Sequence, residues 1–139
     1  MNVQTPQQLT KNADVATRHV LVVEDEEIIR TTLSEFLSSE GYAVSVAGNV
    51  ADAVRLAEAN KFDVFICDVQ LPDGDGVELM RRLLQMKPNA FGLVITAYAT
   101  VENAVEAFTS GAFDYLVKPV ISEDLQHKLE RVFLNTVNF

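Results

Sequence analysis

The sequence predicts one open α/β domain in which a five-stranded parallel sheet is covered by helices on both faces. Three observations predict this class: short β-branched apolar runs alternate with helix-like segments, the runs are apolar almost throughout, and polar residues follow each run. Strands buried on both faces lack the alternation of a half-exposed sheet. Right-handed crossovers between such strands then favour a doubly wound (βα)5 sandwich.

The length and composition suit a single globular domain. The chain has 139 residues, of which 48% are hydrophobic and 22% charged. Its net charge of −9 argues against a nucleic-acid surface, which needs clustered basic residues. No apolar stretch approaches the roughly 18 residues of a membrane span, and no secretory signal is apparent, so we expect a cytoplasmic protein without membrane contact. We expect residues 1–17 to form a flexible tail and residues 18–139 the domain.

The first half of the domain contains strands predicted at 19–23, 42–47 and 63–67. A helix beginning at Glu26 follows the first strand and ends at Gly41, a typical C-terminal glycine. Asn49 is the expected N-cap of the next helix. The apolar residues of these two helices have the spacing of a helix face: Ile29, Leu33, Phe36 and Leu37, then Val50, Ala53, Val54 and Ala57. The third strand ends at Asp68, and a loop of turn formers at 71–76 follows.

The second half repeats the pattern with strands at 91–95 and 113–117. Asp75 and Glu78 resemble a capping box that opens a third helix, which ends at Lys87-Pro88. Thr100 and Ser122 are expected to cap the last two helices, and Gly111 ends the first of these. The side chains expected to face the core are Val101, Ala104, Val105 and Phe108, then Leu125, Leu129, Val132 and Phe133.

Reactive side chains follow four of the five strands: Glu24 and Asp25, Asp68, Thr96, and Lys118. The carboxyl ends of parallel strands form the ligand crevice of an open sheet. We take the strand order 2-1-3-4-5 from known flavodoxin-like sheets, in which the first and third strands flank the switch point, where the strand order reverses. These side chains should therefore meet at one edge.

The residue types at this edge suit a divalent metal and a phosphoryl group. Three carboxylates repel one another unless a cation lies between them, and all-oxygen ligation favours Mg²⁺. A zinc site is not expected, because no Cys/His set has ligand spacing. Asp68 is the best nucleophile, since carboxylates form covalent phosphoryl intermediates. Lys118, the Thr96 hydroxyl and the Ala97 N–H are expected to bind phosphoryl oxygens.

Each of these residues also has an ordinary structural interpretation. We interpret Glu26 and Glu27 as helix caps or solvated residues, and Asp73 and Asp75 as turn and cap residues. Taken alone, Lys118 is typical of a surface, Thr96 of a turn and Tyr115 of a strand. The coincidence of such residues at the ends of four strands favours the functional interpretation.

Four segments resemble the motifs of two-component receiver domains: Leu21-Val22-Val23-Glu24-Asp25-Glu26, Asp68 to Gly76, Val94-Ile95-Thr96-Ala97-Tyr98, and Asp114-Tyr115-Leu116-Val117-Lys118-Pro119. The resemblance covers roughly residues 18–137. It implies a response-regulator phosphoprotein in which Asp68 accepts a phosphoryl group from a histidine kinase or phosphotransfer protein. The domain would catalyse only its own phosphorylation and dephosphorylation, so we do not expect an enzyme with an external substrate.

The resemblance also implies a role for each residue at the edge. Asp25, Asp68 and the Gln70 backbone carbonyl would bind Mg²⁺, and Glu24 would act mainly through a metal-bound water. Thr96, the Ala97 amide and Lys118 would hold the phosphoryl group. Thr96 and Tyr115 would form a switch that repacks the surface of the fourth helix, fifth strand and fifth helix, where a homodimer could form. The Lys118-Pro119 bond would be cis.

Finer features concern hydrolysis and output. Gln70 and Tyr98 occupy positions that tune hydrolysis in the family, and we expect Tyr98 to shield the acyl phosphate from water. Residues 98–105 and 111–115 resemble receivers of nitrogen-regulation-type enhancer-binding activators, which suggests transcription regulation. This sequence has no P-loop and no basic helix-turn-helix, so it is either a receiver fragment or a stand-alone receiver.

Three other hypotheses remain open at this point. A receiver-like adaptor working without phosphorylation would not need the intact set of Asp68, Thr96 and Lys118. A haloacid-dehalogenase-like phosphohydrolase normally has a second aspartate where Gln70 stands. A flavodoxin-like cofactor binder needs a phosphate-cradling loop after the first strand, where Glu24 and Asp25 would repel a phosphate.

Overall fold

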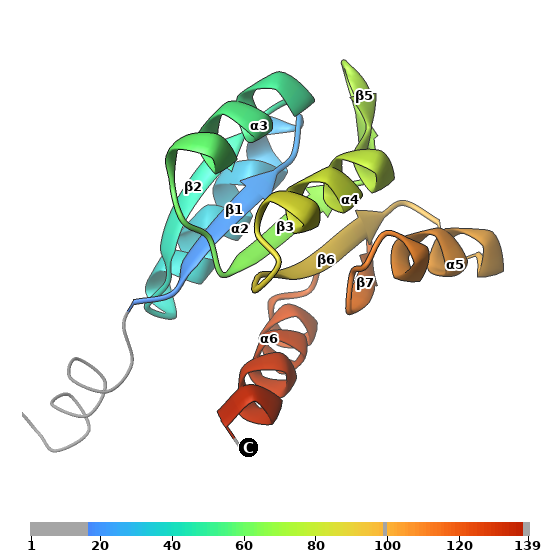
Figure 1. The fold of residues 1–139 in the computed structure, drawn as a ribbon. Helices are drawn as coiled ribbons and strands as arrows, with labels where there is room; N and C mark the ends of the chain where they lie inside the picture. The colour runs from blue at the N-terminus through green and yellow to red at the C-terminus, as the bar shows by residue number, and fades with distance from the viewer. Residues whose placement is uncertain (1–16, 99, 138–139) are drawn as a thin grey trace, which may run out of the picture.

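A five-stranded parallel sheet forms the centre of the molecule in the computed structural model, which describes residues 17–98 and 100–137 (Figure 1). Its strands are β1 (His19–Val23), β2 (Ala43–Ala47), β3 (Val64–Asp68), β6 (Phe91–Thr96) and β7 (Asp114–Val117). Their order, β2-β1-β3-β6-β7, confirms the predicted order 2-1-3-4-5, since β6 and β7 are the fourth and fifth strands of the sheet. The tail expected at 1–17 lies, except for Thr17, outside the described residues.

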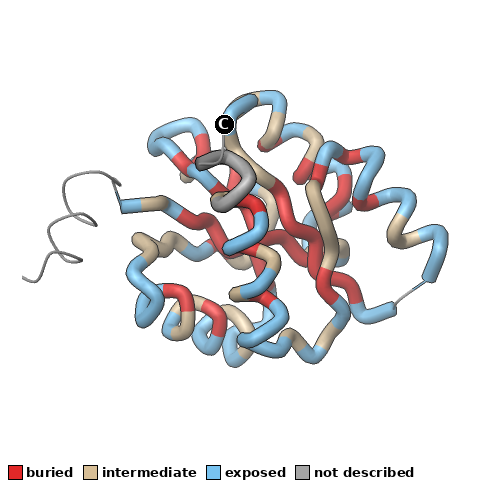
Figure 2. The backbone as a smooth tube through the Cα atoms, turned by 90° about the horizontal axis from the view of Figure 1, so that it is seen from below, coloured by how far each residue is buried: buried red, intermediate tan, exposed pale blue. Residues whose placement is uncertain are grey.

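Five helices cover the two faces of this sheet: α2 (Glu27–Ser39), α3 (Val50–Ala59), α4 (Gly76–Met86), α5 (Val101–Thr109) and α6 (Ser122–Val137). Helices α2 and α6 pack on one face, and α3, α4 and α5 on the other (Figure 1). Successive residues of a strand point to opposite faces of the sheet: Val20 and Val22 pack against the layer of α2 and α6, and Leu21 and Val23 against the layer of α3, α4 and α5. Figure 2 shows the result, with buried residues along the strands and exposed residues on the outer sides of the helices.

The strand register aligns the ends that carry the polar residues. Val23 lies opposite Cys67 in β3, so Glu24 follows β1 at the level of Asp68. Asp68 pairs with Ile95, and Thr96 with Val117. The four strand ends therefore arrive at one edge of the sheet within one residue of each other.

The predicted helix caps are mostly present. The Asn49 side chain accepts a hydrogen bond from the Asp52 N–H at 2.8 Å, and Thr100 accepts one from the Asn103 N–H at 3.1 Å. Gly41 and Gly111 follow helices with φ values of 96° and 100°, which glycine adopts without strain.

Three local predictions were wrong in detail. The segment expected to be a loop contains a short antiparallel hairpin, β4 (Gln70–Leu71) and β5 (Gly74–Asp75). Asp75 caps α4 through the Val77 N–H at 2.8 Å, but Glu78 pairs with Arg81 and does not complete a capping box. Helix α6 begins at Ser122 itself, so Ile121 and not Ser122 precedes it, and the Ile121 carbonyl accepts from the Leu125 N–H at 3.1 Å.

The predicted core face of α5 was also wrong. Val101, Val105 and Phe108 are 77%, 54% and 52% exposed, whereas Ala107 is fully buried and Ala104 partly buried. The helix carries two adjacent apolar stripes, one of large residues and one of alanines. The helix packs through the alanines, and spacing alone could not choose between the two stripes.

Among the described residues, no helix has both the length and the hydrophobicity needed to cross a membrane.

Candidate functional site

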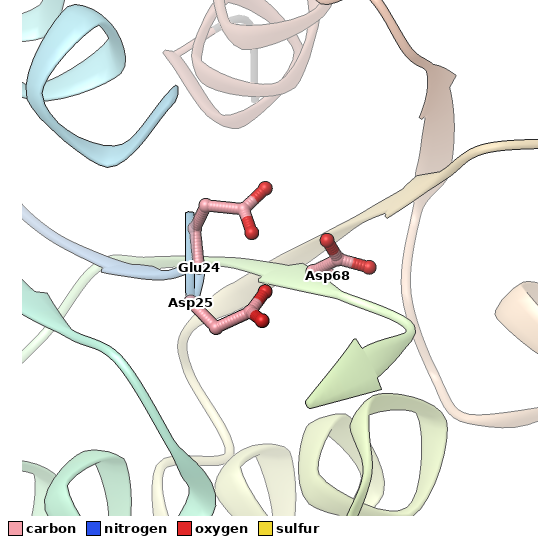
Figure 3. Close-up of side chains that lie close together, drawn as sticks. All are labelled: Glu24, Asp25 and Asp68. Carbon is pink, nitrogen blue, oxygen red and sulfur yellow. The ribbon is translucent and has the colours of Figure 1, made fainter. Parts of the chain in front are cut away.

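Three carboxylates meet at the carboxyl edge of the sheet. Glu24 and Asp25 follow β1, Asp68 ends β3, and one ligand oxygen from each lies within 4.8 Å of the others. Figure 3 shows Glu24 and Asp25 leaving the end of β1 beside each other, with Asp68 close by on the neighbouring strand. Glu24 and Asp68 are buried and Asp25 is exposed. The predicted convergence of these residues is confirmed.

Lys118 lies among these carboxylates because β7 ends beside β6 at the same edge. Its Nζ is 2.5 Å from Asp68 Oδ2, 3.0 Å from Glu24 Oε1 and 3.3 Å from Glu26 Oε1. Burial acts to lower the pKa of Lys118, but the hydrogen bond to Asp68 and the negative charges of Asp68 and Glu24 outweigh it and raise that pKa. Lys118 is therefore a permanent positive charge next to Asp68.

Glu24 has no exposed surface, and burial raises its pKa from 4.5 to about 7, against the lowering influence of Lys118 and of the Glu26 N–H. Its Oε2 accepts from the Glu26 N–H at 3.2 Å. Its Oε1 has no hydrogen-bond partner among the described residues. Lys118 Nζ lies close to this oxygen, but the orientation of the two groups is not that of a hydrogen bond. A buried oxygen without a donor is costly, and a hard cation or its water would satisfy it.

The charge balance also favours a cation. Even when Glu24 is protonated, the carboxylates of Asp25, Glu26 and Asp68 outnumber the single ammonium of Lys118. An all-oxygen set of this kind fits a hard divalent ion such as Mg²⁺. The residues present therefore fit the predicted metal site.

The Asp68 carboxylate is held in one orientation. Its Oδ1 accepts from the Gln70 N–H at 2.9 Å, while its Oδ2 faces Lys118. Behind it, α4 begins at Gly76, where a Cβ would lie only 1.8 Å from the Asp68 carbonyl oxygen. Glycine is needed here because the first turn of α4 packs directly against the end of β3.

Thr96 ends β6 with its hydroxyl engaged inside its own loop. Its Oγ1 donates to the Tyr98 carbonyl and accepts from the Tyr98 N–H, both at 3.2 Å. Asn103 Nδ2 donates to the same Oγ1 at 3.3 Å. Thr96 borders a hollow of about 290 Å³ whose other lining residues are Asp25, Glu26, Asp68, Val69, Gln70, Ala97, Tyr98, Asn103 and Lys118.

The remaining predicted residues surround this hollow or lie behind it. Ala97 and Gln70 line it, as does Tyr98, which is 67% exposed. Tyr115 is half-buried on β7, and its ring meets Phe108 of α5 edge-on, with the ring centres 6.4 Å apart. The Lys118-Pro119 bond is cis, as the resemblance implied.

Three residues that take part in the site were not predicted to do so from the sequence. Glu26 occupies the N-cap position of α2 but makes no side-chain capping bond, so of its two predicted roles, cap or solvated residue, only the second is confirmed: its side chain is 61% exposed, and its carboxylate lies 3.3 Å from Lys118 Nζ. Arg30 Nη1 donates to the Glu24 carbonyl at 2.9 Å and so supports the backbone of the acidic pair. Asn103 reaches back from α5 to Thr96. The position of Glu26 directly after the acidic pair is the only sequence feature that could have indicated its place in the site. No local sequence pattern indicates such a place for Arg30 or Asn103.

Comparisons with known proteins agree on one family. A family model described as the response regulator receiver domain matches residues 20–130. Transcriptional regulatory protein ZraR of Escherichia coli (strain K12) is 36% identical over 117 residues, which are 84% of this chain and 26% of that protein. The chain thus spans about a quarter of the length of this curated relative.

Solved structures show the same likeness. A response regulator receiver domain protein (CheY-like) from Methanospirillum hungatei JF-1 has a TM-score of 0.83 at 28% identity, covering 88% of this chain and 98% of that one. A response regulator from Burkholderia pseudomallei has a TM-score of 0.74 at 38% identity, covering 78% and 64%. That crystal structure contains a phosphorylated aspartic acid, a calcium ion and citrate.

Proposed function

The chain belongs to the response regulator receiver domain family, and from this premise we propose that it is a phosphorylatable switch whose phosphoacceptor is Asp68. Family membership removes the phosphohydrolase and cofactor-binder hypotheses. The observation that carries the proposal is the pocket at the sheet edge, where Asp68 lies 2.5 Å from the Lys118 ammonium and beside Glu24 and Asp25.

The reaction is a transfer from a phosphohistidine of a sensor kinase or phosphotransfer protein. An Asp68 carboxylate oxygen forms a bond to phosphorus, the P–N bond to the donor imidazole breaks, and its electron pair stays on the imidazole nitrogen. The Lys118 ammonium already contacts the Asp68 carboxylate, and it moves from there to an oxygen of the transferred phosphoryl group. The Thr96 hydroxyl and the Ala97 N–H donate to the other oxygens.

Glu24, Asp25, Asp68 and the Gln70 carbonyl are the groups that would hold Mg²⁺. When bound, the ion neutralises charge on the carboxylates and on the transferred group. The Gln70 N–H keeps Asp68 oriented, and the exposed Tyr98 ring limits the approach of water to the acyl phosphate. Gln70 and Tyr98 thereby set the lifetime of the phosphorylated state.

The output follows from the packing around Thr96 and Tyr115. When Thr96 turns toward the phosphoryl group, Tyr115 moves inward and loses its contact with Phe108, which changes the surface of α5, β7 and α6. The exposed Val101, Val105 and Phe108 give this surface an apolar face for a second copy or an output domain. Relatives named as transcriptional regulators support a role in transcription, as in enhancer-binding activators, and a cytoplasmic location.

Intact mass spectrometry tests the phosphoacceptor. We expect wild type incubated with Mg²⁺ and a small phosphodonor to gain one phosphoryl group, and Asp68→Asn to gain none. Omitting Mg²⁺ should abolish the gain. Asp63→Asn is the matched control, because Asp63 precedes the same strand at the opposite edge, where it accepts from the His19 N–H. It should be labelled like wild type.

Two outcomes would contradict the proposal. Labelling of Asp68→Asn at the wild-type level would place the phosphoryl group on another residue. A folded wild type that stays unmodified would favour an adaptor that works without phosphorylation.

A further inference from the structure

Asn103 is a polar side chain of the pocket to which neither the sequence nor the proposed function gives a role. It lies in the first turn of α5, and its Nδ2 donates to the Tyr98 carbonyl at 2.9 Å and to Thr96 Oγ1 at 3.3 Å. We propose that Asn103 is a positioning residue that holds Thr96 in its resting hydrogen bonds and so opposes closure of the pocket on a phosphoryl group. This inference rests on the proposed function.

The Thr96 hydroxyl has a single hydrogen to donate. In the structure that hydrogen is directed to the Tyr98 carbonyl, and the oxygen accepts from the Tyr98 N–H and from Asn103. A threonine that holds a phosphoryl oxygen must donate the same hydrogen to it. The resting loop and the phosphoryl group therefore compete for Thr96.

Asn103 favours the resting side of this competition. An interaction shifts a two-state equilibrium only as far as it differs between the states. The bond to the Tyr98 carbonyl is exposed, so water can replace Asn103 there in either state. The bond to Thr96 is partly buried, and it depends on the resting position of the hydroxyl.

The position of Asn103 also links the pocket to α5. Its N–H is capped by Thr100, so its backbone is part of the helix, while its side chain reaches the end of β6. Of the residues of α5, only Ala107 is fully buried. The bond to Thr96 thus connects the first turn of a helix with a small buried face to the end of β6, and its release when the phosphoryl group is bound would loosen this connection.

Beryllofluoride, which mimics a bound phosphoryl group, tests the inference. In the presence of Mg²⁺ we expect Asn103→Ala to bind it about two- to five-fold more tightly than wild type, the factor for one weak hydrogen bond. Affinity for Mg²⁺ alone should stay unchanged, because Asn103 bonds to none of the metal-binding carboxylates. Calorimetry gives both constants, and urea unfolding checks that the variant is folded.

Two further variants separate positioning from a general structural effect. In a Thr96→Ala background the gain from Asn103→Ala should disappear, because Asn103 acts through that hydroxyl. Asn60→Ala is the matched control: like Asn103, Asn60 donates an exposed side-chain hydrogen bond to a backbone carbonyl, that of Leu56 at 3.0 Å, but it lies at the opposite edge of the sheet. It should bind beryllofluoride like wild type.

Each contrary result identifies what fails. Unchanged or weaker beryllofluoride binding by Asn103→Ala, or an equal gain in the Thr96→Ala background, would overturn the inference and leave the phosphoacceptor role intact. A folded wild type that takes neither beryllofluoride nor a phosphoryl group would overturn the proposed function, and the inference with it.

Discussion

Helices α4 and α5 cover the same face of the sheet but are attached to it very differently. In α4 the large apolar residues Leu79, Met80 and Leu83 are 2% exposed or less. In α5 the large apolar residues point outward, and Ala107 is the residue that is fully buried. Because a buried leucine contributes about 1.5–3 kcal/mol and an alanine much less, α4 is firmly anchored and α5 is not.

This difference matches what the two helices support. The N-terminus of α4 packs behind Asp68 at Gly76 and keeps the proposed phosphoacceptor in place. The first turn of α5 holds Thr96 through Asn103, on the side where the proposed switch must move. A weakly anchored helix can shift at low cost, so the element that must respond is also the one with the smaller buried face.

The largest effect should come from truncating a buried side chain of α4. We expect Leu83→Ala to lower the free energy of unfolding by about 2–5 kcal/mol, because it leaves a cavity in the core. Val105→Ala in α5 should change it by less than about 0.5 kcal/mol, since Val105 is mostly exposed. Urea unfolding measures both. Equal losses in the two helices would show that α5 is anchored as firmly as α4.

A smaller effect is expected at the start of α4. Gly76→Ala should cost about 1–3 kcal/mol in unfolding free energy, because its Cβ would overlap the Asp68 backbone and α4 must move away. Phosphorylation should slow at the same time, since Asp68 moves with its backbone. Gly74→Ala is the control: its Cβ would approach only the Val50 side chain, at 3.0 Å. A Gly76→Ala variant as stable and active as Gly74→Ala would remove α4 as the support of the site.

The smallest effect concerns α6, which is tied to β7 by charges. Burial acts to raise the pKa of Asp114, but hydrogen bonds from Lys128 and the Tyr115 N–H, with the Arg131 charge, hold it below its usual value. Lys128 Nζ and Arg131 Nη2 both lie 2.7 Å from Asp114 Oδ2.

Because the pKa of Asp114 is lower in the folded state, its ionised form stabilises the fold at pH values above the unfolded-state pKa of about 3.9. This stabilisation is lost as the pH falls through the folded-state pKa. Asp114→Asn should therefore lower stability by about 1–2 kcal/mol at pH 7, and the deficit should shrink below about pH 4. Urea unfolding across this range measures it. A deficit independent of pH would mean that packing, and not charge, attaches α6.

Most of the strand ends and caps could be predicted because their causes are local. Asp68 ends β3, Asn49 and Thr100 cap their helices, and Gly111 has a positive φ, each close to where turn and cap chemistry placed it. The exposed face of α5 could not be predicted in this way. This helix carries two neighbouring apolar stripes with the same spacing, one of large residues and one of alanines. The alanine stripe packs on the sheet because its small side chains allow the closest approach.

The sequence by itself determined the five strands, the residues that end them and the identity of the proposed phosphoacceptor, because strand and turn preferences act between neighbours in the chain. Only the tertiary structure decided that Glu26 faces Lys118, that Arg30 supports the Glu24 backbone and that Asn103 bonds to Thr96. These contacts depend on where each helix crosses the sheet and on how far its first turn reaches. Packing of the whole core sets both.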